Sequence, residues 1–296
     1  MSVKKALIII LICFCAMISL SGRPGQTQES PPSADQAKLN KILEATAQYC
    51  ERLKSMALYF VCHENINERT YEFGRTRVVR FIPDPEKNNL FTTIDDLRVT
   101  KTIKHSFIFD YQMIKKGKDL KEKRDLLEEN GKKRNEKDVE LKTLRMSAKY
   151  LVFGPFGFLG KSWQPHFKYE IIGAGKVGKK SAVVLRAVPR EISEENNCFG
   201  RIWVDDDDAS ILQIEWEPQS IANYKEIVDS PIGDLKRRIS WTVIYDIVKN
   251  GIRFPGAQVI KETFISPAGK EHTKYEAAYT YNQYRYFTVE TYVIYK

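Results

Sequence analysis

The most constraining feature of this chain is a series of short segments in which apolar and polar residues alternate. In one of them, Ile239, Trp241 and Val243 fall on one side of an extended chain, and Ser240 and Thr242 fall on the other. A period of two indicates a strand with one buried face. Eight segments of this character follow one another: Phe167–Ile172, Ser181–Pro189, Phe199–Asp205, Ser210–Trp216, Ile239–Val248, Ala257–Ile265, His272–Tyr281 and Tyr286–Tyr295. Short strands joined by turns predict an antiparallel sheet, a sandwich or an open barrel.

The N-terminal half begins differently. Between residues 33 and 58, apolar residues recur every three or four positions, which predicts a helix packed along one stripe. From Leu58 the period changes to two, and Tyr71–Ile82 and Lys101–Ile114 continue it. One helix is therefore expected ahead of the strands, with no internal repeat and no second domain.

The first residues have the pattern of a secretory signal peptide. Lys4 and Lys5 precede the apolar run Ala6–Leu20, which is shorter than the ~20 residues that a membrane-spanning helix needs. We expect a signal peptide over residues 1–22, a flexible leader over 23–33 and a single domain over 34–296. The alternative is an uncleaved anchor. Either outcome predicts an exported protein of the periplasm or cell envelope.

Export affects the cysteines, because disulfides form in oxidising compartments. Cys50, Cys62 and Cys198 remain after the signal segment. Three cysteines allow three pairings, and the closeness of Cys50 to Cys62 in the sequence makes this pair the candidate disulfide.

One segment, residues 115–145, is strongly charged, with 12 basic and 8 acidic residues. Charges of both signs at helical spacing support one another, so we expect two short helices in solvent, broken at Asn130-Gly131. Nucleic-acid-binding faces are basic without matching acids, so the segment does not predict a nucleic-acid partner.

Two glycine-rich stretches resemble nucleotide-binding motifs without meeting their requirements. Gly173–Gly178 reads GAGKVG, but a β-branched strand follows where a dinucleotide site needs a helix, so we expect a hairpin turn. The loop FGPFGFLGKS, over residues 153–162, lacks the spacing of a phosphate loop. Its residues Phe153, Phe156 and Phe158 pack onto the core or form a hydrophobic lid or a membrane-touching loop.

No pattern in the chain predicts catalysis, a bound metal or a cofactor. The four histidines, His63, His105, His166 and His272, are scattered singly, and neither a zinc-protease motif nor a nucleophile elbow is present. A hydrolase remains the alternative if His105 or His166 meets acidic residues in one cleft.

Four consecutive aspartates, Asp205 to Asp208, lie between two predicted strands. A calcium loop would need a glycine at its bend, which is missing here. Aspartate favours turns because its side chain bonds the backbone two residues on. We therefore expect a hairpin turn.

The residues around this turn resemble the LolA-like group of outer-membrane lipoprotein-sorting proteins. The group's hallmark is similar to Gly200-Arg201-Ile202-Trp203-Val204-Asp205, followed by an acidic turn and a further strand, and the similarity extends from residue 168 to the C-terminus. It implies a mainly β (α+β) fold: a curved antiparallel sheet or half-open β-barrel with an N-terminal helix. In the carriers of that group, the concavity of the sheet holds acyl chains, and no bond is broken. Relative to this group, residues 115–145 are an insertion.

These observations predict a non-enzymatic carrier or binder of a hydrophobic ligand, such as an acyl chain or lipoprotein. A curved sheet with an aromatic face either fills its concavity or admits a ligand. The candidate wall residues are Trp203, Leu212, Ile214, Trp216, Trp241, Val243 and Tyr245, with Phe153, Phe156 and Phe158 as a lid. The alternative is an envelope interaction module whose core is filled and whose charged segment meets a protein partner.

Overall fold

The computed structural model describes residues 34–82, 90–116, 119–142, 145–146, 154–191, 199–221, 224–229, 235–266 and 269–286. The predicted signal segment, Cys198 and most of the last predicted strand lie outside these ranges. The chain divides into two compact units, residues 1–37 and 38–296. The side-chain contacts that position the candidate site all lie in the second unit.

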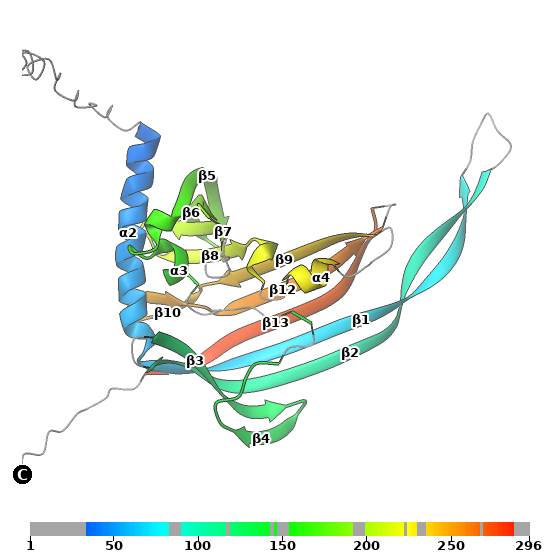
Figure 1. The fold of residues 1–296 in the computed structure, drawn as a ribbon, viewed down its shortest axis with the longest axis horizontal. Helices are drawn as coiled ribbons and strands as arrows, with labels where there is room; N and C mark the ends of the chain where they lie inside the picture. Colours follow the sequence, from blue (N-terminus) through cyan, green and yellow to red (C-terminus); the bar gives the residue numbers. More distant parts are fainter. Residues whose placement is uncertain are drawn as a thin grey trace, which may run out of the picture. The chain divides into compact units, whose positions relative to one another are not determined.

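Strands dominate the described residues (Figure 1). Four elements precede residue 130: α2 (Ala34–Ala57), β1 (Phe60–Ile82), β2 (Leu90–Lys116) and β3 (Asp119–Glu129). The middle of the chain forms β4 (Lys132–Glu136), α3 (Phe156–Leu159), the 3-10 helix η2 (Gln164–His166), β5 (Phe167–Val177), β6 (Lys180–Pro189), β7 (Gly200–Asp205) and β8 (Ile211–Trp216). The remaining elements are η3 (Pro218–Ser220), α4 (Tyr224–Asp229), β9 (Lys236–Ile244), β10 (Ile247–Lys249), β11 (Ile252–Phe254), β12 (Ala257–Ile265) and β13 (Glu271–Tyr286).

Eleven strands form one sheet in the order β4-β3-β2-β1-β13-β12-β9-β8-β7-β6-β5, and their pairings are antiparallel. Strands β4 and β5 are its edges, and the described pairings do not join them, so the sheet stays open. Register shifts interrupt β1, β2, β5, β8 and β12, and bulges of this kind bend and twist a sheet. The predicted fold class, a curved open antiparallel sheet with an N-terminal helix, is confirmed.

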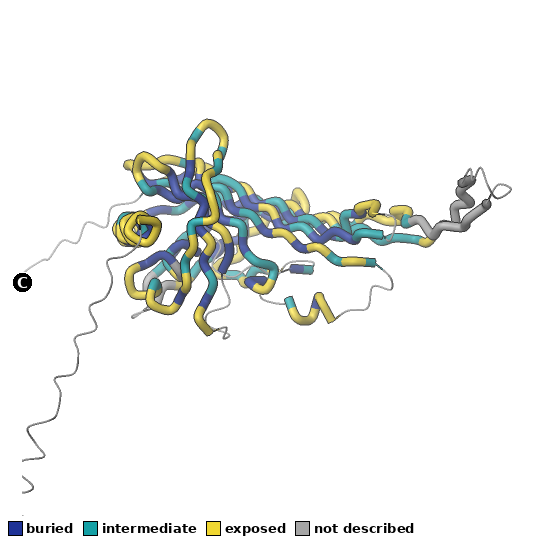
Figure 2. Tube along the Cα trace, turned by 90° about the horizontal axis from the view of Figure 1, so that it is seen from above, coloured by how far each residue is buried: buried dark blue, intermediate teal, exposed yellow. Residues whose placement is uncertain are grey.

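One face of the sheet carries the core (Figure 2). Buried and exposed residues alternate along the strands, as they should when one face packs and the other meets water. On β13, Tyr275, Ala277, Tyr279 and Tyr281 are all buried. The face that these residues share is called the inner face below.

Helix α2 packs through the predicted stripe. Its buried residues include Leu39, Tyr49, Cys50 and Leu53, and all four join the same core cluster as the inner face. The Tyr49 hydroxyl accepts a hydrogen bond from the backbone N–H of Arg253 at 3.0 Å and donates to its carbonyl at 3.2 Å. Among the described residues, no helix is long and apolar enough to cross a membrane.

The charged segment is not helical, and this prediction was wrong. Residues 119–129 and 132–136 form the hairpin β3–β4, which extends the sheet beyond β2. Asn130 and Gly131 have φ values of 50° and 77°, as two-residue hairpin turns require. Pairing with β2 outweighs the helical spacing of the charges, because Arg124 and Leu126 become buried on the inner face. Asn130-Gly131 was the sequence signal for the hairpin.

The candidate disulfide is also corrected. Cys50 and Cys62 are separate buried thiols. The Cys50 sulfur lies 3.7 Å from the carbonyl of Pro155, whereas Cys62 is hydrogen-bonded to Tyr284. The two side chains face different neighbours, and burial raises the pKa of both thiols.

Candidate ligand-binding pocket

A pocket of about 460 Å³ lies where β2, β3 and the segment after β4 meet. Its apolar lining comes from Phe107 and Phe109 of β2, Leu126 of β3 and Val139. The two phenylalanine rings stack with centroids 5.5 Å apart. Small-molecule sites have volumes of roughly 300–1,000 Å³, so this pocket has a suitable size.

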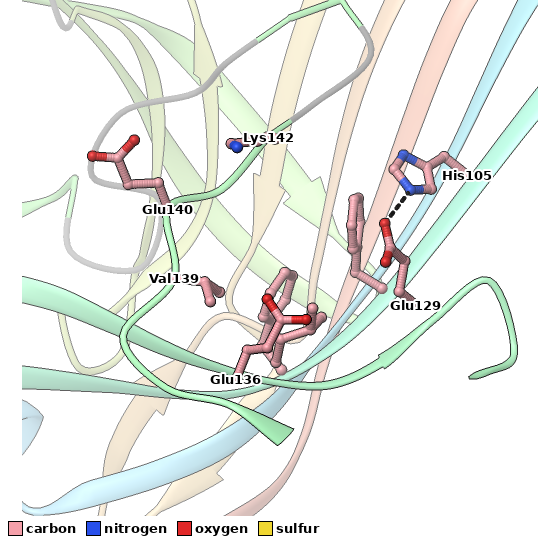
Figure 3. Close-up of a pocket in the computed structure, with 9 residues that line it drawn as sticks. His105, Glu129, Glu136, Val139, Glu140 and Lys142 are labelled. Carbon is pink, nitrogen blue, oxygen red and sulfur yellow. Dashed lines mark hydrogen bonds and ion pairs between the residues drawn. The ribbon is translucent and has the colours of Figure 1, made fainter. Parts of the chain in front are cut away.

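Ionisable side chains complete the lining: His105, Glu129, Glu136, Glu140 and Lys142. Figure 3 shows His105 and Glu129 together on one side of the pocket, with Glu140 on the other. Glu136, Glu140 and Lys142 are exposed, whereas Phe107, Phe109 and Leu126 are buried. The pocket is therefore amphipathic, with an aromatic floor and a charged rim.

His105 links the rim to the interior. Its Nε2 lies 3.2 Å from Glu129 Oε1, and its Nδ1 lies 3.9 Å from Glu68 Oε2, too far for a hydrogen bond. Glu68 is buried and accepts a short hydrogen bond from the Tyr275 hydroxyl. Hydrogen bonds from His105 and then from Arg134 hold the pKa of Glu129 below its usual range.

A buried ion pair joins β3 to the centre of the sheet. Arg124 donates from Nε to Glu64 Oε2 at 2.6 Å and from Nη2 to Glu64 Oε1 at 3.1 Å. The Glu64 side chain is 0% exposed and that of Arg124 is 8% exposed. Strand β2 lies between β1 and β3, and the ring centroid of its Tyr111 is 4.8 Å from the Arg124 guanidinium carbon. Arg124 therefore reaches across β2 to hold the strand that contributes Leu126 to the pocket.

Further hydrogen bonds satisfy this pair. Glu64 accepts from the Tyr281 hydroxyl at 3.1 Å, and Glu122 accepts from Arg124 at 2.9 Å and from Tyr111 at 3.0 Å. Burial works to lower the pKa of Arg124, but Glu64 and Glu122 raise it well above its ordinary value. The guanidinium is therefore held as a cation in the interior, where an unpaired charge would be costly.

The segment that follows β4 is held by Asp125. Its carboxylate accepts hydrogen bonds from the backbone N–H of Asp138 at 2.9 Å, from Lys137 at 3.2 Å and from Lys123 at 3.3 Å. Partial burial works to raise the pKa of Asp125, but these hydrogen bonds together lower it. Asp125 thus fixes the chain immediately before Val139, which lines the pocket.

The predicted wall residues lie elsewhere on the inner face. Ile214, Trp216, Trp241, Val243 and Tyr245 are buried in the core cluster. The Trp216 and Trp241 rings pack 5.3 Å apart. Both tryptophans also line a second pocket, of about 310 Å³, together with polar residues that include Arg201 and Glu215. A role of the predicted wall residues in ligand binding stays a prediction.

Two of the predicted wall residues, Leu212 and Trp203, do not join the core cluster on the inner face. Leu212 is buried outside the core cluster, because the register shift in the β7–β8 pairing places Ile211, not Leu212, opposite Val204. Trp203 is half-buried and stands against Gly175, where an added Cβ would meet its Nε1 at 2.8 Å. The apolar and polar residues of β8 alternate in the sequence, and this alternation did not reveal the register shift at Leu212.

The apolar loop turns inward. Pro155, Leu159 and Gly160 are buried, and Phe156 packs partly buried against the core. Phe153 lies outside the described residues, as does the side chain of Phe158. In the described part of the loop and the turn that follows it, Trp163 is the large apolar side chain left exposed.

The aspartate run forms the predicted hairpin turn. Asp205 Oδ1 accepts from the backbone N–H of Asp207 at 3.0 Å, and Asp208 Oδ1 accepts from that of Ser210 at 2.9 Å. Ala209 takes a φ of 55°. Asp205 is buried and lies 3.2 Å from the ammonium of Lys180. Within the described residues, no group of three or more His, Cys, Asp or Glu side chains is arranged to hold a metal ion.

Sequence reasoning found His105 and the segment that contains Glu129 and Arg124 but did not bring them together. The pocket depends on the pairing of β3 with β2. Because residues 115–145 were expected to be helical, this pairing was not predicted. The signal was an alternation within β3, where Glu122, Arg124 and Leu126 share the inner face and Lys121, Lys123 and Asp125 do not.

No protein-family model and no curated protein matches the chain. The structure is similar to a DUF1329 family protein from Desulfovibrio piger (TM-score 0.38, 11% identity, 84% of this chain and 95% of that one). It is also similar to a LolA superfamily protein from Nitrosomonas europaea (TM-score 0.34, 11% identity, 84% of this chain and 94% of that one). A third similar structure is a domain from Vibrio parahaemolyticus assigned to outer-membrane lipoprotein sorting. Its TM-score is 0.32 and its identity 11%, and the match covers 84% of this chain and 95% of that one.

Proposed function

We propose that this chain is an exported, non-enzymatic binder or carrier of an amphipathic lipid-like ligand in the cell envelope. The pocket over Phe107, Phe109 and Leu126 supports this proposal most directly. An acyl chain has the apolar character of that floor, and the ionisable rim would face a polar head group. The apolar run Ala6–Leu20 supports export.

The alternative is an interaction module whose concavity is filled. The packing of Trp216 against Trp241 in the core cluster favours it, because these residues were expected to form the cavity wall. The two functions make different predictions for the pocket beside β3, since a module without a ligand would not depend on its volume.

Hydrolysis receives less support than binding. His105 does meet Glu129 and Glu68, as the hydrolase alternative required. However, Nε2 is already engaged by Glu129, and the nine lining residues contain no serine, threonine or cysteine as a nucleophile.

The test is to fill the pocket. We expect native mass spectrometry of the exported protein to show bound lipid, and Val139→Trp to lower both bound lipid and the affinity for a fluorescent fatty acid by at least tenfold. Val259→Trp is the matched control, because Val259 is 39% exposed on β12. A protein that carries no lipid and takes up no fatty acid would refute the carrier and leave the interaction module. Equal losses in both variants would also refute the assigned pocket.

A further inference from the structure

The segment that follows β4 bridges the inner face of the sheet. The backbone N–H of Val139 donates to the carbonyl of Arg124 on β3 at 2.9 Å. Six residues later, Arg145 donates from Nη2 to Glu262 Oε1 on β12 at 3.0 Å. Strands β2, β1 and β13 lie between β3 and β12 in the sheet. We call residues 137–142 the strap and the pair of Arg145 with Glu262 the clasp.

The strap forms one wall of the pocket beside β3. Val139, Glu140 and Lys142 line the pocket from the strap, and the aromatic floor lies on β2. Figure 3 shows these three residues on one coil, across the pocket from His105 and Glu129. The pocket is therefore enclosed between the strap and the sheet, and displacing the strap would open it along this side.

The second half of the strap is held more loosely than its start. Within the described residues, no backbone hydrogen bond joins residues 140–142 to the sheet. Val139 and Leu141 are only partly buried where they pack against the core cluster, and Glu140 and Lys142 are exposed. Segments with few buried apolar contacts and few backbone hydrogen bonds open at a lower free energy than the core does. The clasp is therefore the main tie beyond Val139.

The clasp can open without leaving a buried charge unpaired. The Glu262 side chain is 0% exposed, and Arg237 also pairs with it, with Nε 2.9 Å from Oε1. The Arg145 side chain is 25% exposed, so its guanidinium is already partly in water. Lys274 is a further cation nearby, and burial and then the charge of Arg145 lower its pKa. If Arg145 leaves, Glu262 keeps Arg237 as its partner, which makes the clasp reversible.

We propose that the strap is a gate over the pocket, and that it swings away to admit and release the ligand when the clasp between Arg145 and Glu262 opens. The role of the ligand rests on the proposed function, whereas the opening of the strap does not. Arg145 is not one of the residues that line the pocket, so it controls access without contacting the ligand. Segments that close over a binding site set the rates of entry and release in many proteins.

Hydrogen exchange of the ligand-free protein tests the strap first. Arg145→Met removes the clasp while Arg237 still pairs with Glu262, so the variant should fold. We expect amide exchange in residues 137–146 to quicken by about tenfold, because hydrogen bonds between charged groups are lost. Arg145→Lys keeps the charge without the bidentate geometry, so its exchange should fall between the two. Arg238→Met is the matched control, since it removes an exposed pair with Glu271 on the same sheet and should leave exchange in the strap unchanged.

Stopped-flow binding of a fluorescent fatty acid then tests whether the strap is a gate. We expect Arg145→Met to quicken uptake and release by similar factors, so that Kd changes less than either rate. The proposal is overturned if Arg145→Met leaves exchange in residues 137–146 unchanged, if Arg238→Met quickens it equally, or if exchange rises while fatty-acid release keeps the parent rate. A parent protein that takes up no fatty acid refutes the proposed carrier instead, and the exchange of the ligand-free protein still decides whether the clasp holds the strap.

Discussion

The residue that most determines the site is Arg124, because it carries a charge into the interior from an edge hairpin. Its bidentate bonds to Glu64, its contact with the Tyr111 ring and its bond to Glu122 leave both carboxylates paired. Pairs of this kind need not add net stability, because desolvation opposes the attraction. Removing one partner is different, since the other charge remains buried.

We therefore expect Arg124→Met to lower the free energy of unfolding by about 3–5 kcal/mol. Lys121→Met is the matched control, because Lys121 lies on the same strand and makes an exposed pair with Asp138, worth about 1 kcal/mol or less. Urea unfolding of both variants measures the difference. Equal losses would show that the buried pair does not hold β3 in place.

Close packing of two strands explains the glycine that begins the motif Gly200–Asp205. A Cβ on Gly200 would stand 2.1 Å from the carbonyl oxygen of Glu215 and 2.9 Å from the Trp216 Cα. The close approach of β7 to β8 therefore excludes any side chain at this position. The first residue of the G-x-I-W-V-D pattern is thus required by packing and not by a ligand.

At the scale of elements, the hairpin β3–β4 forms one wall of the pocket, and carboxylates hold it. Asp125 accepts a hydrogen bond from Asp138, in the segment that follows β4, and Glu129 bonds His105 and Arg134. Both carboxyls have pKa values below their ordinary range in the folded protein. In the unfolded chain these values return to about 3.9 for Asp and 4.3 for Glu.

A group whose pKa is lowered by folding stabilises the protein above its unfolded pKa, and this contribution disappears as the pH falls through the folded value. We expect Asp125→Asn/Glu129→Gln to be less stable than the parent at pH 7, and the difference to shrink below about pH 4. Urea midpoints between pH 7 and pH 3 measure it. Glu51→Gln on the exposed face of α2 is the control and should match the parent at pH 7. A difference that does not shrink as the pH falls would contradict the linkage.

At the scale of the whole molecule, one core cluster joins α2 to the inner face of the sheet. The buried thiols report on this packing, since Cys50 on α2 faces Pro155 and Cys62 lies within β1. Burial raises the pKa of both thiols, so little thiolate is available.

We expect Cys50 and Cys62 to resist a thiol reagent in the native protein and to react fully in denaturant. Site-resolved mass spectrometry measures the labelling at each cysteine. A peptide pair linked through Cys50 and Cys62 would contradict the packing of the two side chains and restore the disulfide that their spacing suggested.

Local patterns were enough to predict the N-terminal helix, the alternating strands, the aspartate turn and an antiparallel β class, whereas the curved, open sheet was implied by the resemblance to the LolA-like group. Each depends on residues close together in the chain, and the sheet that they imply was confirmed. The charged segment was mispredicted because one set of charges satisfies both a helical spacing and an alternating strand. Only burial of Arg124 and Leu126 against β2 distinguishes the two.

Outside the charged segment, the sequence alone therefore determined which segments are strands and which turn, because propensity and periodicity are local. Only the tertiary structure decided where a ligand has room. Glu64 and Arg124 are 60 residues apart, and Tyr281 is 217 residues from Glu64, yet all three meet on the inner face. The Trp216 and Trp241 rings pack against each other, and the pocket with an aromatic floor lies over Phe107 and Phe109. The position of open volume depends on contacts between residues that are far apart in the sequence, and a local sequence pattern does not record these contacts.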